Sequence, residues 1–155
     1  MGSYREHALE GASAIDLVVA LYDGIIRFLH AAGEAAERGD AIERRIAVKR
    51  ALDIIIHLQA RLRMDVGGHP AQVLSEFYAS VFAQILQASQ SASRQKFEHA
   101  INCVRNVRDA WKQAAKDPSL TSSSSQLPAL PLRGQAAHNR ENFAADSAVG
   151  SGWNA

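Results

Sequence analysis

Residues 21–29, Leu-Tyr-Asp-Gly-Ile-Ile-Arg-Phe-Leu, belong to the most constraining pattern of this chain. Around Tyr22, apolar side chains recur at the spacing of an α-helix. They are Ile15, Val18, Val19, Ile25, Ile26 and Leu29. A second apolar stripe lies outside this arc and consists of Leu17, Leu21 and Phe28. A helix that only covers a core needs one apolar face, so the second stripe indicates a neighbour on another side: another helix, an N-terminal arm or a client protein.

Capping residues predict where the first two helices begin and end. Ser13 as N-cap and Gly39 as the residue after the last turn predict a first helix over about residues 14–37. Asp40 is a favourable N-cap for a second helix, and the pair Gly67-Gly68 is expected to end it. The expected inner face of the second helix is Val48, Ala51, Leu52, Ile55, Leu58, Leu62 and Val66.

Two further helices follow in the sequence. Pro70 suits the first position of a third helix, which would run to about Ser89. Ser91 and Ser93 are candidate caps for a fourth helix, which would end near Ala115. The expected inner faces are Leu74, Phe77, Tyr78, Val81, Ile85 and Ala88 in the third helix, and Phe97, Ala100, Ile101, Val104, Val107 and Trp111 in the fourth.

The connections between these helices are short, so successive helices should pack antiparallel. The chain shows no alternation of strands and turns that would predict a sheet. The sequence therefore predicts an all-α fold, an antiparallel up-down four-helix bundle over residues 13–116, preceded by a short N-terminal arm of residues 1–12.

Residues 117–155 have a different composition. They contain a run of four serines at 122–125 and three of the four prolines, and their apolar residues are sparse and aperiodic. Such a segment cannot bury enough apolar surface to offset the entropy lost on ordering. We expect a disordered C-terminal tail, with docking of residues 127–132, Leu-Pro-Ala-Leu-Pro-Leu, as the alternative.

The overall composition excludes several classes of partner. Lys and Arg number 17 against 16 Asp and Glu, and no sustained basic face is present, so a nucleic acid is not an expected partner. No apolar run is long enough to cross a membrane, and the N-terminus lacks a signal-peptide core. The single cysteine, Cys103, suits a reducing compartment. We expect a soluble cytoplasmic protein without membrane insertion.

The motifs of common active sites are missing from the chain. A di-iron bundle would carry Glu-x-x-His on facing helices, and a zinc site would show histidines at ligand spacing; neither occurs. Gly67-Gly68 lacks the Lys-Ser/Thr of a phosphate-binding loop. A triad built from distant residues stays open. We expect no metal, no cofactor and no enzymatic activity.

Several segments of the chain together resemble one family. They are residues 21–29, residues 58–68 (Leu-Gln-Ala-Arg-Leu-Arg-Met-Asp-Val-Gly-Gly), Ala71, Leu74, Tyr78, Leu86 and Ala88 in the third helix, residues 107–111 (Val-Arg-Asp-Ala-Trp), and Tyr4. In this order and spacing, they are similar to the FliS family of flagellin-specific export chaperones. The resemblance extends from Tyr4 to Trp111.

Some positions depart from the family pattern. The departures are Ala14 in place of Pro, Arg63 in place of an acidic residue, Phe77 in place of Leu, Ala79 in place of Asp, Ser80 in place of Tyr, and Ser89 in place of Asn. Those in the third helix fall near the surface expected to touch the client. The identity of the client and the affinity for it therefore stay open.

The resemblance implies a binding function in the cytoplasm. Its partners would be the C-terminal segment of flagellin, which is kept from premature polymerisation, and the flagellar export gate. The residues expected to line the client groove are Ile54, Ile56, Leu58, Leu74, Tyr78, Val81, Phe82 and Leu86. Tyr4 would belong to an arm that covers the groove or docks at the gate.

Three questions stay open on the sequence alone. Asp23 either pairs with a group on a neighbouring helix or faces solvent. The same groove would also suit a helical adaptor or regulatory scaffold that binds a peptide other than flagellin. The chain is expected to be a monomer or a weak homodimer, because exposed apolar flanks promote self-association.

Overall fold

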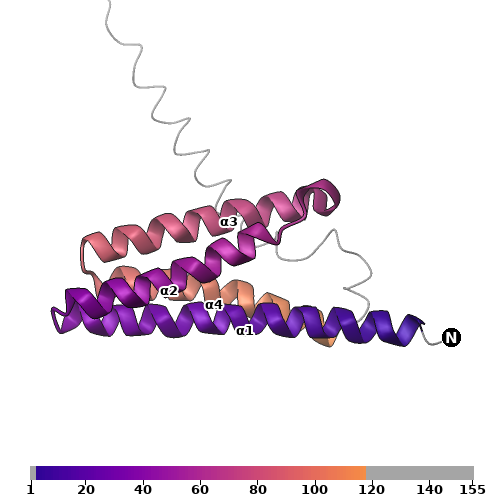
Figure 1. The fold of residues 1–155 in the computed structure, drawn as a ribbon, viewed down its shortest axis with the longest axis horizontal. Coiled ribbons are helices and arrows are strands. Elements are labelled where there is room, and N and C mark those ends of the chain that lie inside the picture. Colours follow the sequence, from indigo (N-terminus) through magenta and orange to yellow (C-terminus); the bar gives the residue numbers. More distant parts are fainter. Residues whose placement is uncertain (1–2, 118–155) are drawn as a thin grey trace, which may run out of the picture.

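The computed structural model of this protein describes the backbone of residues 3–117 and the side chains of residues 14–117. The described residues form four α-helices and contain no strand. The helices are α1 (Ser3–Glu37), α2 (Ala41–Ala60), α3 (Met64–Gln90) and α4 (Arg94–Lys116). Successive helices run in opposite directions, and each packs against its neighbours in the order α1, α2, α3, α4 and back to α1 (Figure 1). The predicted up-down four-helix bundle is confirmed.

The helix caps between α1 and α2 and between α3 and α4 match the sequence signals. Gly39 follows α1 with a φ of +71°, a conformation that favours glycine. The Asp40 carboxylate accepts a hydrogen bond from the backbone N–H of Glu43 at 3.0 Å. The Ser93 hydroxyl accepts one from the N–H of Lys96 at 3.2 Å. These side chains satisfy N–H groups that the first turns of α2 and α4 cannot pair internally.

The start of α1 differs from the prediction. The helix begins at Ser3, so residues 3–12 are helical and Ser13 lies inside α1 instead of capping it. Good helix formers such as Ala8, Leu9 and Glu10 precede Ser13, and they outweigh the capping signal. The resulting long helix extends beyond the ends of α2 and α3 (Figure 1).

The end of α2 also differs from the prediction. The helix ends at Ala60, and Arg63 leaves the helical conformation before α3 begins at Met64. The Gly67-Gly68 pair still redirects the chain, but it does so inside α3, where Gly68 has φ 53° and ψ −140°. Pro70 follows in the first turn after this kink. Val66, expected on the inner face, is 69% exposed because the chain has already turned there.

Each glycine of this pair has its own steric reason. A Cβ on Gly67 would lie 2.5 Å from the Cβ of Ala71, well inside van der Waals contact. Gly68 has open space around it but holds a positive φ that side chains disfavour. The pair therefore allows the first turn of α3 to fold tightly over the rest of the helix.

The core is formed by the predicted inner faces. All six expected positions of α3 are buried, as are five of the six in α4, while Trp111 is partly buried. In α2, Val48, Ala51, Ile55 and Leu58 are buried. In α1, Tyr22, Ile25, Ile26 and Leu29 are buried, but Ile15, Val18 and Val19 are only partly covered. These three lie in the part of α1 near its projecting end.

A polar contact lies inside this apolar core. The hydroxyls of Tyr22 on α1 and Tyr78 on α3 are hydrogen-bonded at 2.6 Å, and their rings meet edge to face. The indole N–H of Trp111 on α4 donates to the Tyr22 oxygen at 3.3 Å. Three helices thus meet at one hydroxyl group. Burial raises the pKa of both tyrosines above the ordinary value.

The two residues after Tyr22 contact other helices. The carboxylate of Asp23 accepts a hydrogen bond from Arg108 on α4 at 2.7 Å, which settles that Asp23 is paired. Gly24 is buried, and a Cβ there would lie 3.2 Å from the Cδ1 of Ile54 on α2. Residues 22–24 therefore connect α1 with every other helix of the bundle.

Replacing Gly68 by Ala should destabilise the bundle. Because the substitution keeps the strained φ, we expect the free energy of unfolding to fall by about 1–3 kcal/mol in urea denaturation. Gly33→Ala is the matched control, since a Cβ there would make ordinary contacts with Arg94 and Phe97 at 3.5 and 3.6 Å. It should leave stability unchanged or raise it by up to about 1 kcal/mol. Equal effects of the two substitutions would contradict this account of the kink.

The losses of stability caused by Tyr22→Phe and by Tyr78→Phe should not be additive. Tyr78→Phe leaves Tyr22 with Trp111 as its partner, so we expect a loss of about 1–2 kcal/mol. Tyr22→Phe leaves both Tyr78 and Trp111 without this partner and should cost more. Removing both hydroxyls leaves fewer buried groups unpaired, so the double variant should cost less than the sum of the single ones. Additive losses would show that the two hydroxyls are not coupled.

The tyrosine pair should make the bundle sensitive to alkali. The unfolded chain titrates tyrosine near 10, and burial raises the pKa of Tyr22 and Tyr78 in the folded state. Above pH 10 the folded state therefore binds more protons, and stability falls as pH rises. Well below pH 10 both hydroxyls are protonated in the folded and the unfolded state, so they should not make the free energy of unfolding depend on pH. Urea denaturation from pH 8 to 11 should show a steeper alkaline loss for the wild type than for the Tyr22→Phe/Tyr78→Phe variant.

Candidate functional site

One hydrogen bond identifies the facing edges of α2 and α3. The side-chain amide of Gln59 donates to the hydroxyl of Ser75 at 3.4 Å. Residues three, four or seven positions away along a helix share its face. On this basis we define the α2–α3 seam as Leu52, Ile56, Gln59, Ser75, Ala79, Phe82 and Leu86.

The seam presents apolar side chains to solvent. Ile56 is 54% exposed and Leu86 is 40% exposed, while Leu52 and Phe82 are partly buried against the core. Ala79 is small, so the surface between the larger side chains is shallow. α2 crosses the bundle obliquely, close to α1 near its start and close to α3 near its end (Figure 1). The seam is therefore a shallow apolar surface, bounded at one end by the α2–α3 turn.

Three of the predicted groove residues fall on this seam by their helical spacing. They are Ile56, Phe82 and Leu86. Leu58, Leu74, Tyr78 and Val81 lie beneath it in the core, and Tyr78 is only 3% exposed. Ile54 packs toward Gly24 of α1 and lies at the opposite edge of α2. Their helical spacing could not distinguish core from groove, because both need apolar residues on adjoining faces.

The other predicted functional segments are described only in part. The backbone of Tyr4 lies in α1, but its side chain lies outside the described residues. Residues 118–155, which make up nearly all of the expected tail, lie outside them as well. The roles expected for Tyr4 and for the tail stay predictions.

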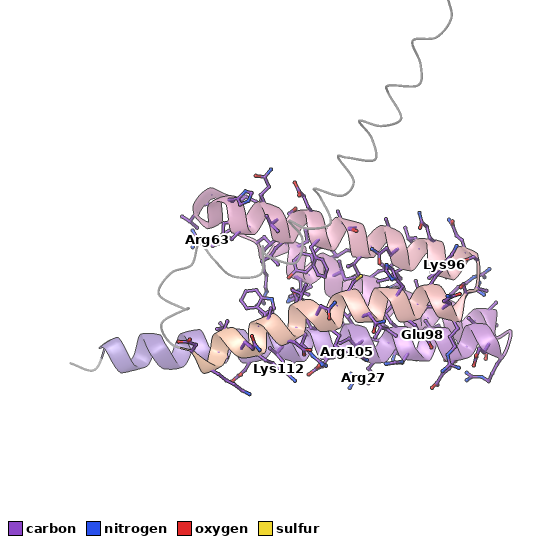
Figure 2. All side chains as sticks on the ribbon, turned by 180° about the vertical axis from the view of Figure 1, so that it is seen from behind. Arg27, Arg63, Lys96, Glu98, Arg105 and Lys112 are labelled. Carbon is purple, nitrogen blue, oxygen red and sulfur yellow. The ribbon has the colours of Figure 1, made fainter. Side chains whose placement is uncertain are left out.

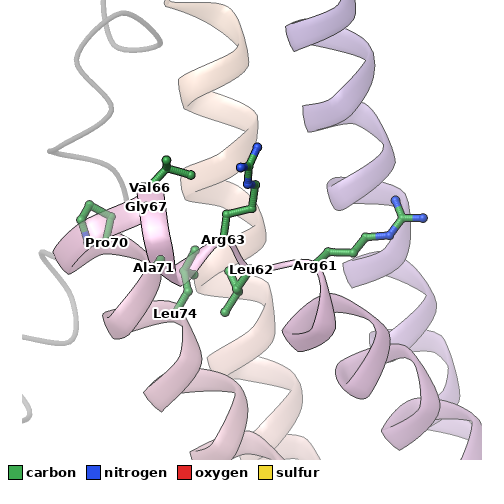
Figure 3. Close-up of a pocket in the computed structure, with 8 residues that line it drawn as sticks. All are labelled: Arg61, Leu62, Arg63, Val66, Gly67, Pro70, Ala71 and Leu74. Atoms are coloured by element: carbon green, nitrogen blue, oxygen red, sulfur yellow. The ribbon is translucent and has the colours of Figure 1, made fainter.

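A second surface feature lies at the turn between α2 and α3. A cavity of about 350 Å³ is lined by Arg61, Leu62, Arg63, Val66, Gly67, Pro70, Ala71 and Leu74 (Figure 3). Leu62, Ala71 and Leu74 cluster together in its interior, and the two arginine side chains extend away from them. Sequence analysis missed this cavity. The signal available was the unusual Arg63 next to Gly67-Gly68, and its meaning depends on the turn being in place.

The electrostatics of this cavity are positive. Arg61 makes no ion pair with any residue from 14 to 117. Arg63 approaches Asp65 at 3.6 Å, but both side chains are more than 70% exposed. An exposed pair of this kind contributes little energy. Both guanidinium groups are therefore available to a ligand.

The opposite side of the bundle has a different surface. There α1 and α4 carry charged side chains, among them Arg27, Arg105 and Lys112 (Figure 2). This charged covering contrasts with the apolar seam between α2 and α3. The contrast makes the seam the strongest candidate for binding an apolar segment.

The described residues offer no site for metal or thiol chemistry. No group of three or more His, Cys, Asp or Glu residues that could hold a metal occurs among them. Cys103 is half-buried, and burial raises the pKa of its thiol, which disfavours the reactive thiolate. Within the same part of the chain, no helix is long and apolar enough to cross a membrane.

Comparison with known proteins agrees with the bundle and its motifs. The sequence model of the family described as "Flagellar protein FliS" matches residues 1–118. The chain is 33% identical over 119 residues to the flagellar secretion chaperone FliS of Salmonella typhimurium, covering 76% of this chain and 88% of the relative. It is 32% identical over 105 residues to the protein of that name in Vibrio cholerae, covering 68% and 77%.

A third relative, the flagellar secretion chaperone FliS of Campylobacter jejuni, is 32% identical over 112 residues. That match covers 72% of this chain and 87% of the relative. The residues matched by the family model, 1–118, span all four helices of the bundle. The chain belongs to the FliS family of flagellar proteins.

Proposed function

We propose that this chain is a cytoplasmic chaperone that binds the C-terminal segment of flagellin, prevents its premature polymerisation and delivers it to the flagellar export gate. The family membership and the names of the relatives, flagellar secretion chaperones, support the general role. The observation that carries the binding role is the α2–α3 seam, where Ile56, Phe82 and Leu86 remain accessible on a complete bundle.

The geometry of the seam suits an amphipathic helix. A helical ligand places apolar anchors at positions i, i+3, i+4 and i+7 along one face. Phe82 and Leu86 lie one turn apart on α3, with Ile56 on the facing edge of α2. A segment laid along the seam would cover these side chains and extend the bundle with a further helix. The core beneath them, including Val81 at 1% exposure, provides a closely packed base.

Binding of this kind requires no chemical step. An unfolded segment pays an ordering cost when it binds, so a long contact surface is needed for useful affinity. The same cost lets the segment leave once a downstream partner competes for it. A chaperone role therefore agrees with the absence of a metal-ligand cluster in the described residues.

A helical adaptor for a different peptide is the second candidate function. It would use the same seam, because an apolar groove does not by itself specify one helix. The departures Ala79 and Ser80 on α3 favour keeping this alternative, since they alter the family pattern beside the seam. The two functions differ in which peptide saturates the protein at a stoichiometric ratio.

Substituting the exposed seam residues should remove binding without unfolding the protein. A synthetic peptide of the flagellin C-terminal segment from the same organism should form a one-to-one complex in isothermal titration calorimetry. Ile56→Glu and Leu86→Glu should each weaken it at least tenfold, because each buries a charge where an apolar side chain was. Both residues are exposed, so the free energy of unfolding should change by less than about 0.5 kcal/mol.

Ile42→Glu is the matched control for this experiment. Ile42 is 70% exposed and lies on the same helix, about four turns from Ile56. Its substitution should leave the affinity unchanged. If the wild-type protein forms no saturable complex with the flagellin peptide, the flagellin function is wrong and the adaptor function remains. If the complex forms but survives both seam substitutions, the seam is not the binding site.

A further inference from the structure

The outward face of α2 carries an apolar stripe of its own. Exposed residues of this helix recur at alternating spacings of four and three positions, which places them on one narrow line. We define this outer stripe as Ile42, Ile46, Lys49, Asp53, Ile56 and Ala60. It lies opposite the buried positions of α2, among them the fully enclosed Ala51. A surface helix needs only one apolar face, so the bundle itself does not require the isoleucines of this stripe.

The three isoleucines of the outer stripe are accessible from outside the bundle. Ile42 is 70% exposed, Ile46 is 42% exposed and Ile56 is 54% exposed. Single apolar residues at a surface are common, but these three share one line along the helix. α2 passes in front of α4 in Figure 1, and its outer stripe is turned away from the other helices. The stripe is therefore open to a partner outside the bundle.

A pair of opposite charges occupies the centre of the outer stripe. The ammonium group of Lys49 lies 3.0 Å from the carboxylate of Asp53, and the two side chains are 78% and 57% exposed. A single pair that is so exposed contributes little to stability. It does give the stripe one positive and one negative position, with Ile46 before them and Ile56 after them. A complementary surface would present the opposite charges, and apolar side chains, in the reverse order.

A second copy of α2 in antiparallel orientation presents this pattern. Lys49 and Asp53 lie two positions to either side of Ala51, and Ile46 and Ile56 lie five positions to either side of it. In an antiparallel pair centred on Ala51, Lys49 therefore faces Asp53 of the second copy. By the same symmetry, Ile46 faces Ile56 of the second copy. A parallel pair would instead place each charge against its own kind, which is unfavourable.

Pairing in this way would keep the existing ion pair and add new ones. Each Lys49 would lie between the Asp53 of its own helix and that of the second copy, so four charges would alternate in sign. Such networks contribute more than separate pairs. The isoleucines on both sides of the charges would leave water at the same time. Arg50 does not disturb this contact, because its guanidinium group is directed toward α1, 5.7 Å from the centre of the Phe28 ring.

We propose that two copies of this chain associate through the outer stripe, with their α2 helices antiparallel and related by a two-fold axis at Ala51. One helix per copy forms the contact, and charges interrupt it, so the dissociation constant is on the order of 0.1 mM. Ile56 also belongs to the α2–α3 seam, so the dimer covers part of the surface that a client would use. This competition rests on the function proposed above, whereas the dimer itself does not.

Sedimentation equilibrium of the full chain without client tests the dimer directly. The wild type should be mostly monomeric at about 0.01 mM and mostly dimeric at about 1 mM. Lys49→Glu and Asp53→Lys each place like charges opposite each other, so each should weaken the dimer at least tenfold. The two substitutions change the net charge in opposite directions, so net charge cannot explain a loss in both. The double variant Lys49→Glu/Asp53→Lys restores alternating charges and should dimerise like the wild type.

Ile46→Glu and Leu17→Glu are a matched pair for the apolar part of the contact. Ile46 is 42% exposed in the stripe, and Leu17 is 49% exposed on α1. Ile46→Glu should weaken the dimer at least tenfold, because it places a charge against Ile56 of the second copy. Leu17→Glu should leave the dimer unchanged. Thermal unfolding should show that all variants remain folded, since each altered side chain is at the surface.

A peptide of the flagellin C-terminal segment tests the competition between dimer and client. A saturating excess should convert the wild-type dimer into complexes of one chain with one peptide. If the peptide binds while the dimer persists, the two surfaces do not overlap and the competition is wrong. If the peptide does not bind at all, the flagellin function fails, whereas the dimer, which is measured without peptide, stands.

Three results would overturn the dimer itself. A wild type that stays monomeric at about 1 mM excludes it. A dimer that survives Ile46→Glu is formed by another surface. If the single charge variants dimerise like the wild type, or if the double variant does not recover, the α2 helices are not paired antiparallel about Ala51.

Discussion

The hydrogen bond between the hydroxyls of Tyr22 and Tyr78 is the contact on which the arrangement of the bundle depends. These residues lie on α1 and α3, which are diagonal to each other and share few direct contacts. Apolar packing tolerates small shifts of one helix along another, whereas a buried hydroxyl that loses its partner costs free energy. The Trp111 indole adds α4 to the same point. The network thereby fixes the register of α1, α3 and α4.

A core closed in this way leaves apolar side chains of the seam exposed. Tyr78 and Val81 complete the interior, so the bundle does not require Ile56 or Leu86 to be covered. Polar groups limit the exposed apolar surface, since the Gln59–Ser75 hydrogen bond lies within the seam. Small, interrupted patches of this kind are less prone to self-association than continuous ones. In the proposed function, folding and binding would therefore use different residues of the same helices.

Helical periodicity was sufficient to predict most of the fold and little of the site. The inner faces of α3 and α4 follow from spacing alone, and the Asp40 and Ser93 caps follow from local hydrogen bonding. The pairing of Asp23 with Arg108 joins residues 85 positions apart, so no local signal reveals it. For the same reason the sequence places Tyr78 in a groove, because its hydrogen-bond partner Tyr22 is 56 positions away in the sequence.

The kink at Gly68 shows why the end of α2 was harder to predict than its face. A helix boundary that is set by tertiary packing has no characteristic capping residue. The sequence therefore predicts that Gly67-Gly68 ends α2, whereas the pair lies after the α2–α3 turn, inside α3. The kinked first turn of α3, with Val66, Gly67 and Pro70, lines the cavity together with Arg61 and Arg63.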